Sequence, residues 1–350
     1  MSGIEILSIS STFQSGLLFR TPWSDLMKSL MIAWVGYQRR ADAMQDYWGY
    51  HLRHFPNVFS SRYLRIFDYF WKVAMSLGAL LRMRPDVVWV QVPPSMLLHM
   101  ACLYKLIVFG RARVVVDLHN SMLRPFWMDF PLSKWLLNRV DVVLAHNAAV
   151  RDELIAIGID KDVIRVLEDK PCSSLTPGKG LSSTEPYALI PCSFDVDEPI
   201  EVVVEAARLL PEVKFFVTGK HEGKILLSNL GDIPKNLVFC GYLSKADFEN
   251  LLSSADAVVG LTTRDNVQLS VANEALSVMR PMVLSDTPVL RDLYGSAARF
   301  VRNGDSTELA EGIRDVVLHS DSYVIKVSQL LLARNERWLK QADAVRKLIE

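Results

Sequence analysis

The sequence has few of the features that mark metal knuckles, disulfide-held domains and membrane spans. Its four cysteines in 350 residues lie far apart and form no CxxC pair, so neither a zinc knuckle nor a secreted disulfide framework is indicated. The longest apolar stretch, 96–109, is interrupted by His99 and Lys105 and is shorter than the roughly 20 residues that span a bilayer. Residues 1–10 lack the basic start and long apolar core of a signal peptide and are expected to form a first strand. A cytoplasmic protein is therefore expected.

The chain also lacks a net charge. Its 39 basic side chains equal its 39 acidic ones, which argues against a disordered chain or a general nucleic-acid binder. The balance is uneven along the chain, because residues 1–176 hold 20 Lys and Arg against 15 Asp and Glu, and residues 177–350 hold 19 against 24. The first part also holds seven of the eight tryptophans. At 100 to 200 residues per domain, this pattern predicts two domains that face different partners.

Short apolar runs alternate with longer amphipathic segments, as in α/β proteins built from parallel sheets. The expected strands are 4–10, 87–92, 113–117, 140–145, 187–191, 214–218, 237–239 and 257–261. The expected helices are 63–83, 148–157, 200–210, 245–253, 306–319 and 324–349. Between the two groups, 169–186 is rich in Pro, Gly, Ser and Thr and is expected to be a linker. We therefore predict two doubly wound domains, 1–175 and 176–323, and a helix, 324–350, that packs back on the first domain.

In such sheets, ligands bind at the carboxyl ends of the strands. After the first expected strand, Ser15 and Gly16 belong to a polar turn that could receive an anion or could be an ordinary turn. After 113–117, Asp117 and His119 could hold sugar hydroxyls or move a proton, or the group could cap the next helix. After 140–145, Asn147 is expected to be a helix N-cap.

Two loops of the second half suit a nucleotide diphosphate. Gly219 and Lys220 end a strand with a flexible residue and a cation, although a solvated surface lysine is the alternative. The polar loop 261–269 leads into a helix that carries Glu274 one turn inside it. A carboxylate there can accept from both ribose hydroxyls, while the amides of Gln268, Leu269 and Ser270 face a phosphate.

These residues resemble a known group of enzymes. The region 257–305, with Glu274-Ala275-Leu276 inside it, resembles the nucleotide-sugar region of the large retaining family of GT-B glycosyltransferases, which contains bacterial mannosyl- and glucosyltransferases. That family has two glutamates eight positions apart, and here Asn266 stands at the first position. The resemblance implies that Glu274 binds the ribose and that the contact to the donor sugar is altered.

The resemblance also implies a phosphate-binding Arg/Lys pair after strand 187–191, where this chain has Cys192-Ser193-Phe194-Asp195 instead; Ser193 joins the expected donor-binding residues. That stretch, together with 90–95, 116–120 and 218–220, is more similar to the chitobiosyldiphosphodolichol β-mannosyltransferase family. The resemblance implies a Rossmann-like GT-B enzyme without cofactor or metal, which moves mannose or a related hexose from a GDP- or UDP-sugar to a saccharide on a polyprenyl diphosphate. Lys220 and helix amides would then meet the charge of the leaving group.

In that reaction Asp117 and His119 are the candidate catalytic residues. Either could deprotonate the acceptor if the reaction inverts, whereas His119 would support the donor sugar if it retains. The basic first domain is expected to bind the acceptor and the inner face of the membrane, without binding nucleic acid. Its expected membrane contact is an amphipathic helix, which could instead face the core. The apolar residues of this helix are Phe19, Trp23, Leu26, Leu30 and Trp34.

Two other classes of protein share this fold. One is a nucleotide-sugar 2-epimerase, which needs no acceptor. The other is a non-catalytic partner subunit, suggested by the missing Arg/Lys pair and by Asn266.

Overall fold

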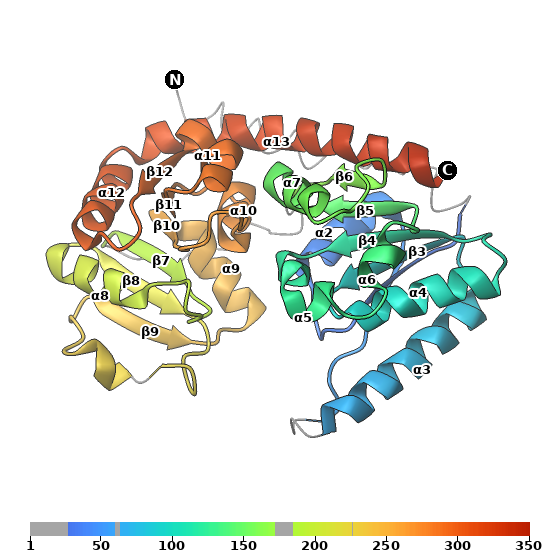
Figure 1. The fold of residues 1–350 in the computed structure, drawn as a ribbon. Helices are drawn as coiled ribbons and strands as arrows, with labels where there is room; N and C mark the ends of the chain where they lie inside the picture. The colour runs from blue at the N-terminus through green and yellow to red at the C-terminus, as the bar shows by residue number, and fades with distance from the viewer. Residues whose placement is uncertain (1–26, 60–63, 172–184, 226) are drawn as a thin grey trace. The chain divides into compact units, whose positions relative to one another are not determined.

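A computed structural model describes residues 27–59, 64–171, 185–225 and 227–350. The described chain forms two six-stranded parallel sheets (Figure 1). The first sheet has the order β2-β1-β3-β4-β5-β6, with strands β1 (Ser29–Ala33), β2 (His51–His54), β3 (Val87–Val92), β4 (Arg113–Leu118), β5 (Val142–Ala145) and β6 (Ile164–Val166). The second has the order β12-β11-β10-β7-β8-β9, with strands β7 (Tyr187–Pro191), β8 (Lys214–Thr218), β9 (Leu237–Gly241), β10 (Ala257–Gly260), β11 (Met282–Ser285) and β12 (Ala298–Val301). The predicted α/β fold class is confirmed.

The helices alternate with the strands along the chain. Those of the first half are α2 (Arg39–Trp48), α3 (Arg65–Met83), α4 (Ser95–Ile107), η2 (Asn120–Leu123), α5 (Pro125–Met128), α6 (Ser133–Leu137) and α7 (Ala148–Ala156). Those of the second half are α8 (Ile200–Leu209), η3 (Leu227–Leu230), α9 (Lys245–Ser254), α10 (Ser270–Ser277), α11 (Pro288–Tyr294), η4 (Gly295–Ala297), α12 (Ser306–Leu318) and α13 (Ser320–Ile349).

The strands are apolar runs because the helices cover both faces of the sheets. All six residues of β3 are buried, and its Trp89 packs on Trp48 with ring centroids 4.7 Å apart. The Trp89 indole N–H is not left unpaired, since it donates to Ser29 Oγ at 3.0 Å. These contacts fix Trp48 and Trp89 in the buried core of the first sheet.

The second sheet changes direction at its centre. The chain runs from β7 outward to β9, then returns to the other side of β7 and continues from β10 to β12. The carboxyl ends of β7 and β10 therefore flank the point where the strand order reverses, which is where doubly wound sheets bind ligands. The loops after β7, β8 and β10 follow three adjacent strands at this point.

The chain separates into two compact units. The first comprises Met1–Asp117 and Pro131–Asp141, and the second comprises Leu118–Phe130 and Val142–Glu350. Within the second unit, α13 packs against α10, η4, β5 and β6. Trp338 of α13 is buried.

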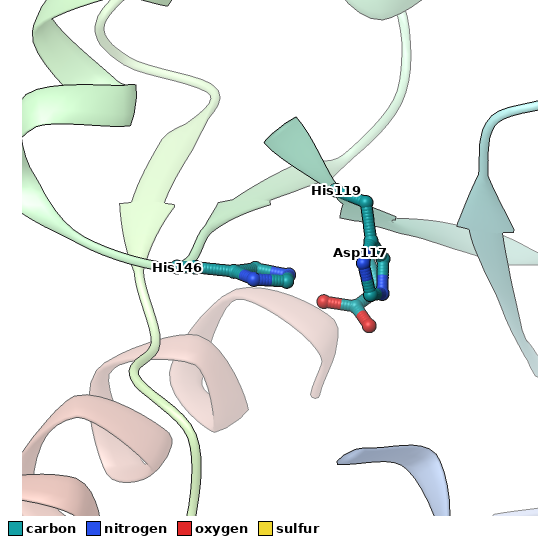
Figure 2. Close-up of side chains that lie close together, drawn as sticks. All are labelled: Asp117, His119 and His146. Carbon is teal, nitrogen blue, oxygen red and sulfur yellow. The ribbon is translucent and has the colours of Figure 1, made fainter. Parts of the chain in front are cut away.

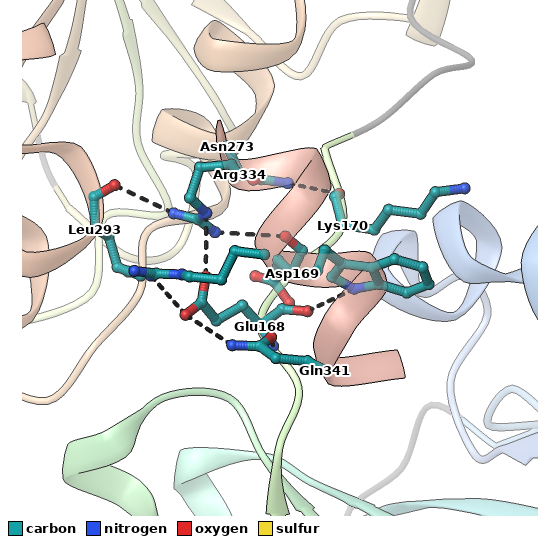
Figure 3. Close-up of polar contacts among 9 residues, drawn as sticks. Glu168, Asp169, Lys170, Asn273, Leu293, Arg334 and Gln341 are labelled. Atoms are coloured by element: carbon teal, nitrogen blue, oxygen red, sulfur yellow. Dashed lines mark hydrogen bonds and ion pairs between the residues drawn. The ribbon is translucent and has the colours of Figure 1, made fainter. Parts of the chain in front are cut away.

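A buried ionic network fastens α13 to the chain that follows β6 (Figure 3). Glu168 forms ion pairs with Arg334, at 3.1 Å, and with Arg337, and it accepts a hydrogen bond from Gln341 Nε2 at 3.1 Å. Trp338 Nε1 donates to the Glu168 carbonyl at 3.0 Å. On the other side, Asn273 of α10 donates to the Lys170 carbonyl at 2.9 Å. Residues 168–170 are thus held by both helices.

One prediction for the first half is wrong. The segment that contains Leu30 and Trp34 is the interior strand β1 and the residue that follows it, not an amphipathic helix, and both side chains are buried. A short apolar run is compatible with a helix or with a strand. Here the segment forms a strand, because it pairs with β2 on one side and with β3 on the other. The other residues of the predicted helix, the predicted strand 4–10, Ser15 and Gly16, and most of the predicted linker lie outside the described residues.

Candidate active site

Two histidines meet where β4 and β5 end. His119 follows β4 and is half-buried, and His146 follows β5 and is buried. Their rings form an edge-to-face pair with centroids 4.6 Å apart. Asn147 caps α7 by accepting from the Val150 amide at 2.9 Å, as predicted, which fixes the chain just after His146.

Asp117, at the end of β4, has a different environment. Its side chain is fully buried, and its Oδ1 lies 2.9 Å from the Arg40 Nε, which is also buried. Because a buried charge is costly unless it is paired, this ion pair keeps both side chains in place. Asp117 is therefore engaged by Arg40 within the protein interior, whereas His119 is half-buried.

Asp117, His119 and His146 lie close enough together to be considered as a metal centre. Each offers one ligand atom, and the three atoms are within 4.8 Å of one another (Figure 2). Two imidazoles and a carboxylate are a chemically reasonable donor set for a transition metal. The Arg40 guanidinium opposes such a metal, because it already neutralises the only anionic member of the set.

The loop between β10 and α10 bonds to the loops that carry the histidines. The Asn266 carbonyl accepts from Asn120 Nδ2 at 2.8 Å and from Asn147 Nδ2 at 3.4 Å. The Asn266 side chain donates to Glu153 Oε2 of α7 at 3.1 Å. These four residues, which we call the asparagine latch, join the residues next to His119 and His146 to the loop that leads to Glu274.

The start of α10 carries the predicted donor-binding residues. Leu269 is the N-cap position of α10, Ser270 is exposed at its first turn, and Glu274 is buried one turn further on. Both polar atoms of the Gln268 side chain are buried without a hydrogen-bond partner among the described residues. Since buried polar groups are nearly always paired, this amide is suited to a ligand.

The loops after β7 and β8 touch at a glycine. Gly219 has φ +128°, and a Cβ at this position would lie 1.9 Å from the Cys192 carbonyl oxygen, so only glycine fits. Lys220, the next residue, is exposed. Burial, with Glu198 nearby, raises the pKa of the Cys192 thiol to about 12, so this thiol is neutral at the strand end.

Two cations at this edge are bonded to carboxylates of the loop after β7. Lys224 Nζ donates to the Ser193 carbonyl at 2.7 Å and to Asp195 Oδ1 at 2.8 Å. The hydrogen bond from Lys224 lowers the pKa of the Asp195 carboxyl.

The second cation joins the loops after β7 and β10. Arg264 pairs with Asp197 at 2.9 Å, and Thr262 Oγ1 donates to Asp197 Oδ2 at 3.2 Å. These bonds bring the loops after β7 and β10 together at the point where the strand order reverses.

Sequence reasoning missed several of these residues. It gave no role in the site to Arg40, Lys224 or Asp197, and it did not predict the asparagine latch as a unit. The pairs are separated by 77 residues in the case of Arg40 and Asp117, and by 146 in the case of Asn120 and Asn266. In the structure, Asn266 is hydrogen-bonded to the residues that follow His119 and His146. Gln268, Ser270 and Glu274 lie further along the same loop and in the first turns of α10.

Two family models match the chain in tandem. The model described as Glycosyltransferase Family 4 matches residues 32–168, and the model described as Glycosyl transferases group 1 matches residues 186–319. Together they cover more than three quarters of the sequence, one for each sheet. The chain belongs to the GT-B glycosyltransferases.

Solved structures share this fold at low sequence identity. Anabaena HepE in complex with UDP-glucose has a TM-score of 0.68 at 16% identity, covering 91% of this chain and 100% of HepE. A sucrose-phosphate synthase from Thermosynechococcus elongatus has a TM-score of 0.67 at 14% identity, covering 92% and 98%. The lipopolysaccharide outer core galactosyltransferase WaaB has a TM-score of 0.55 at 12% identity, covering 89% and 98%. A comparison with curated protein sequences finds no significant match.

Proposed function

We propose that this glycosyltransferase moves a hexose, mannose or a related sugar, from a nucleotide diphosphate-sugar to a saccharide carried on a polyprenyl diphosphate. The observation that carries the proposal is the geometry of α10. Its first turn presents amides and an unpartnered Gln268 amide, and its buried Glu274 stands one turn inside. Amides at a helix N-terminus suit phosphate, and a carboxylate one turn away suits ribose hydroxyls.

In this proposal the diphosphate lies at the loops after β7, β8 and β10. Lys220, Gly219 and the Ser193 loop face its charge, together with the amides of Leu269 and Ser270. Arg264 and Lys224 support it indirectly, because each holds a loop in place through an ion pair. The UDP and UDP-glucose bound by HepE support a nucleotide-sugar donor, and the lipopolysaccharide core acted on by WaaB supports an acceptor of the lipid-linked class.

We infer that His119 contacts the reacting centre and that Asp117 is a positioning residue. An imidazole titrates near neutral pH and can take the proton of an acceptor hydroxyl or bond to the transferred sugar. The Asp117 carboxylate forms a buried ion pair with Arg40, which holds it in place. We further propose that no metal takes part, because Arg40 neutralises Asp117 and because the leaving diphosphate is met by Lys220 and helix amides.

A binding screen tests the donor site. Purified protein is heated with GDP, GDP-mannose, UDP or UDP-glucose. Either the two guanosine ligands or the two uridine ligands are expected to raise its melting temperature, since a ligand that binds the folded state stabilises it. Glu274→Gln keeps the shape of the side chain and should weaken this shift, whereas Glu311→Gln on exposed α12 should not. If no nucleotide stabilises the protein, the proposed donor site is wrong.

A second candidate function is that of a non-catalytic partner subunit. It is favoured by the Asn266 side chain, which bonds to Glu153, and by the pairing of Lys224 and Arg264 with carboxylates of the same loop. Isothermal titration distinguishes the two functions. Heat of binding for a nucleotide-sugar supports the transferase, and its absence at millimolar donor supports the partner subunit.

A further inference from the structure

Helix α3 buries three polar side chains and exposes many of its large apolar ones. Asp68, Lys72 and Ser76 are spaced four residues apart, so they lie on one side of the helix, and all three are buried. The Asp68 carboxylate accepts from the amides of Val58 and Phe59, at 2.8 and 3.2 Å. Ser76 Oγ accepts from Trp34 Nε1 at 2.9 Å. The inward side of α3 is therefore fixed by hydrogen bonds.

The opposite side of α3 is apolar and faces outward. Its exposed residues follow the helical repeat, and Phe67 and Phe70 are 57% and 64% exposed. Together they form what we call the outer face of α3: Ile66, Phe67, Phe70, Trp71, Ala74, Met75, Gly78 and Leu81. From Ile66 to Leu81, at about 1.5 Å per residue, this face is about 22 Å long. Apolar surface of this extent on a folded protein marks an interaction site.

The exposed charges around the outer face are mainly basic; the exception is Asp86, whose exposed carboxylate accepts from the Lys28 amide at 2.8 Å. Arg82 and Arg84, at the end of α3, are exposed, whereas Asp68, the only carboxylate within α3, is buried. α3 packs against α4, and the chain from Val87 to Val116, which contains α4, has no acidic residue. The C-terminal end of α4 exposes Leu106 and leads to Phe109, which is 91% exposed. An apolar, aromatic face with basic flanks fits an anionic bilayer surface.

We propose that the outer face of α3 lies in the interface of a membrane that contains anionic lipids, with Phe67 and Phe70 among the acyl chains and Arg82 at the headgroups. No helix among the described residues is long and apolar enough to cross a bilayer, so the contact is with its surface. The inference extends the proposed function, because a lipid-linked acceptor would be reached from such a surface. It replaces the predicted contact at Leu30 and Trp34, which are buried in the sheet.

Flotation of the purified full chain with vesicles tests the proposal. Wild-type protein should float with vesicles of equal parts phosphatidylcholine and phosphatidylglycerol. The Phe67→Ser/Phe70→Ser double variant should bind these vesicles at least about tenfold more weakly, because it lacks two large apolar side chains whose transfer from water into the bilayer would favour binding. Tyr242→Ser, at a residue that is 85% exposed in the second half, should float like the wild type. Arg82→Glu should weaken binding about fivefold or more to these vesicles and leave binding to pure phosphatidylcholine unchanged.

Three results would overturn the proposal. The wild type could stay with the soluble fraction, or the double variant could float equally well. Sedimentation could also show a wild-type dimer that the double variant splits, which would make the outer face an interface between two copies. The nucleotide thermal shift, measured on the same variants, separates this inference from the proposed function: flotation without nucleotide binding contradicts only the donor site, and nucleotide binding without flotation contradicts only the membrane contact.

Discussion

Replacing Glu168 with glutamine should strongly destabilise the second unit. The change removes one negative charge and almost no volume from the network between α13 and the chain after β6 (Figure 3). Arg334 is 2% exposed, so its guanidinium would stay buried without a counter-charge. Among the described residues, Arg334 also donates to the carbonyls of Leu293 and Asp169, at 3.3 and 3.5 Å, which is the long end of hydrogen-bond geometry, and it lies 5.8 Å from the Tyr294 ring centroid. None of these groups carries a negative charge.

The expected loss is about 3 to 5 kcal/mol of unfolding free energy, which is the usual cost of leaving one member of a buried ion pair uncompensated. The second partner, Arg337, is partly exposed, and its own replacement by glutamine should cost only about 1 kcal/mol or less. Replacing both Glu168 and Arg334, by glutamine and methionine, should cost less than Glu168→Gln alone, because no buried charge is then left over.

Urea unfolding followed by circular dichroism measures these differences for the wild type, for these three variants and for Arg334→Met alone, which completes the cycle with Glu168→Gln. A loss below about 1 kcal/mol for Glu168→Gln would refute the reasoning, because the charge of Arg334 would then be compensated by water or by the two carbonyls. A double variant whose loss equals the sum of its two single losses would refute it as well, since paired charges must couple.

The remaining predictions concern the candidate site. His119→Gln should lower the turnover number by about a hundredfold or more with little change in donor binding, because it removes the imidazole that we place at the reacting centre; undiminished turnover would remove His119 from that role. Asn120→Ser should raise the donor KM more than it lowers turnover, since it loosens the Asn266 loop without touching Glu274; an unchanged KM would show that the latch is not needed for binding. Dialysis against EDTA should leave the transfer rate unchanged, whereas a loss restored by added metal would assign Asp117, His119 and His146 to a metal centre.

The sequence predicts the strands that are buried on both faces. The runs 87–92, 187–191 and 214–218 match β3, β7 and β8 residue for residue, because β-branched and apolar residues are continuous there and a turn follows each. The strand β2, His51–His54, is polar and half-exposed at the edge of its sheet, so it carries no apolar run. The strand β1 has such a run, but helix and strand cannot be told apart over five apolar residues without their partners.

The candidate site was predictable only one loop at a time. His119 and Lys220 could be named because each lies just after an apolar strand, and Glu274 because it lies one turn inside the helix that follows a polar loop. Their partners could not, since Arg40 and Asn120 meet residues that are 77 and 146 positions away. The ion pair of Asp117 with Arg40 is the reason that the proposed function places His119 at the reacting centre, and the sequence alone does not show this pair.

The second half of the chain carries a net negative charge, yet in the proposed function it binds an anionic donor, which that charge would repel. In the loop after β7, acidic side chains are paired with groups of the protein itself. Asp195 is paired with Lys224, Asp197 is paired with Arg264, and the Glu198 carboxylate accepts from the Ser193 amide. These acidic side chains therefore present little unpaired negative charge to the strand ends. The exposed Lys220 and the amides at the start of α10 can then dominate the local field, since interactions between charges far from the site are screened within about 10 Å at ordinary ionic strength. A negative domain can in this way hold a positive site.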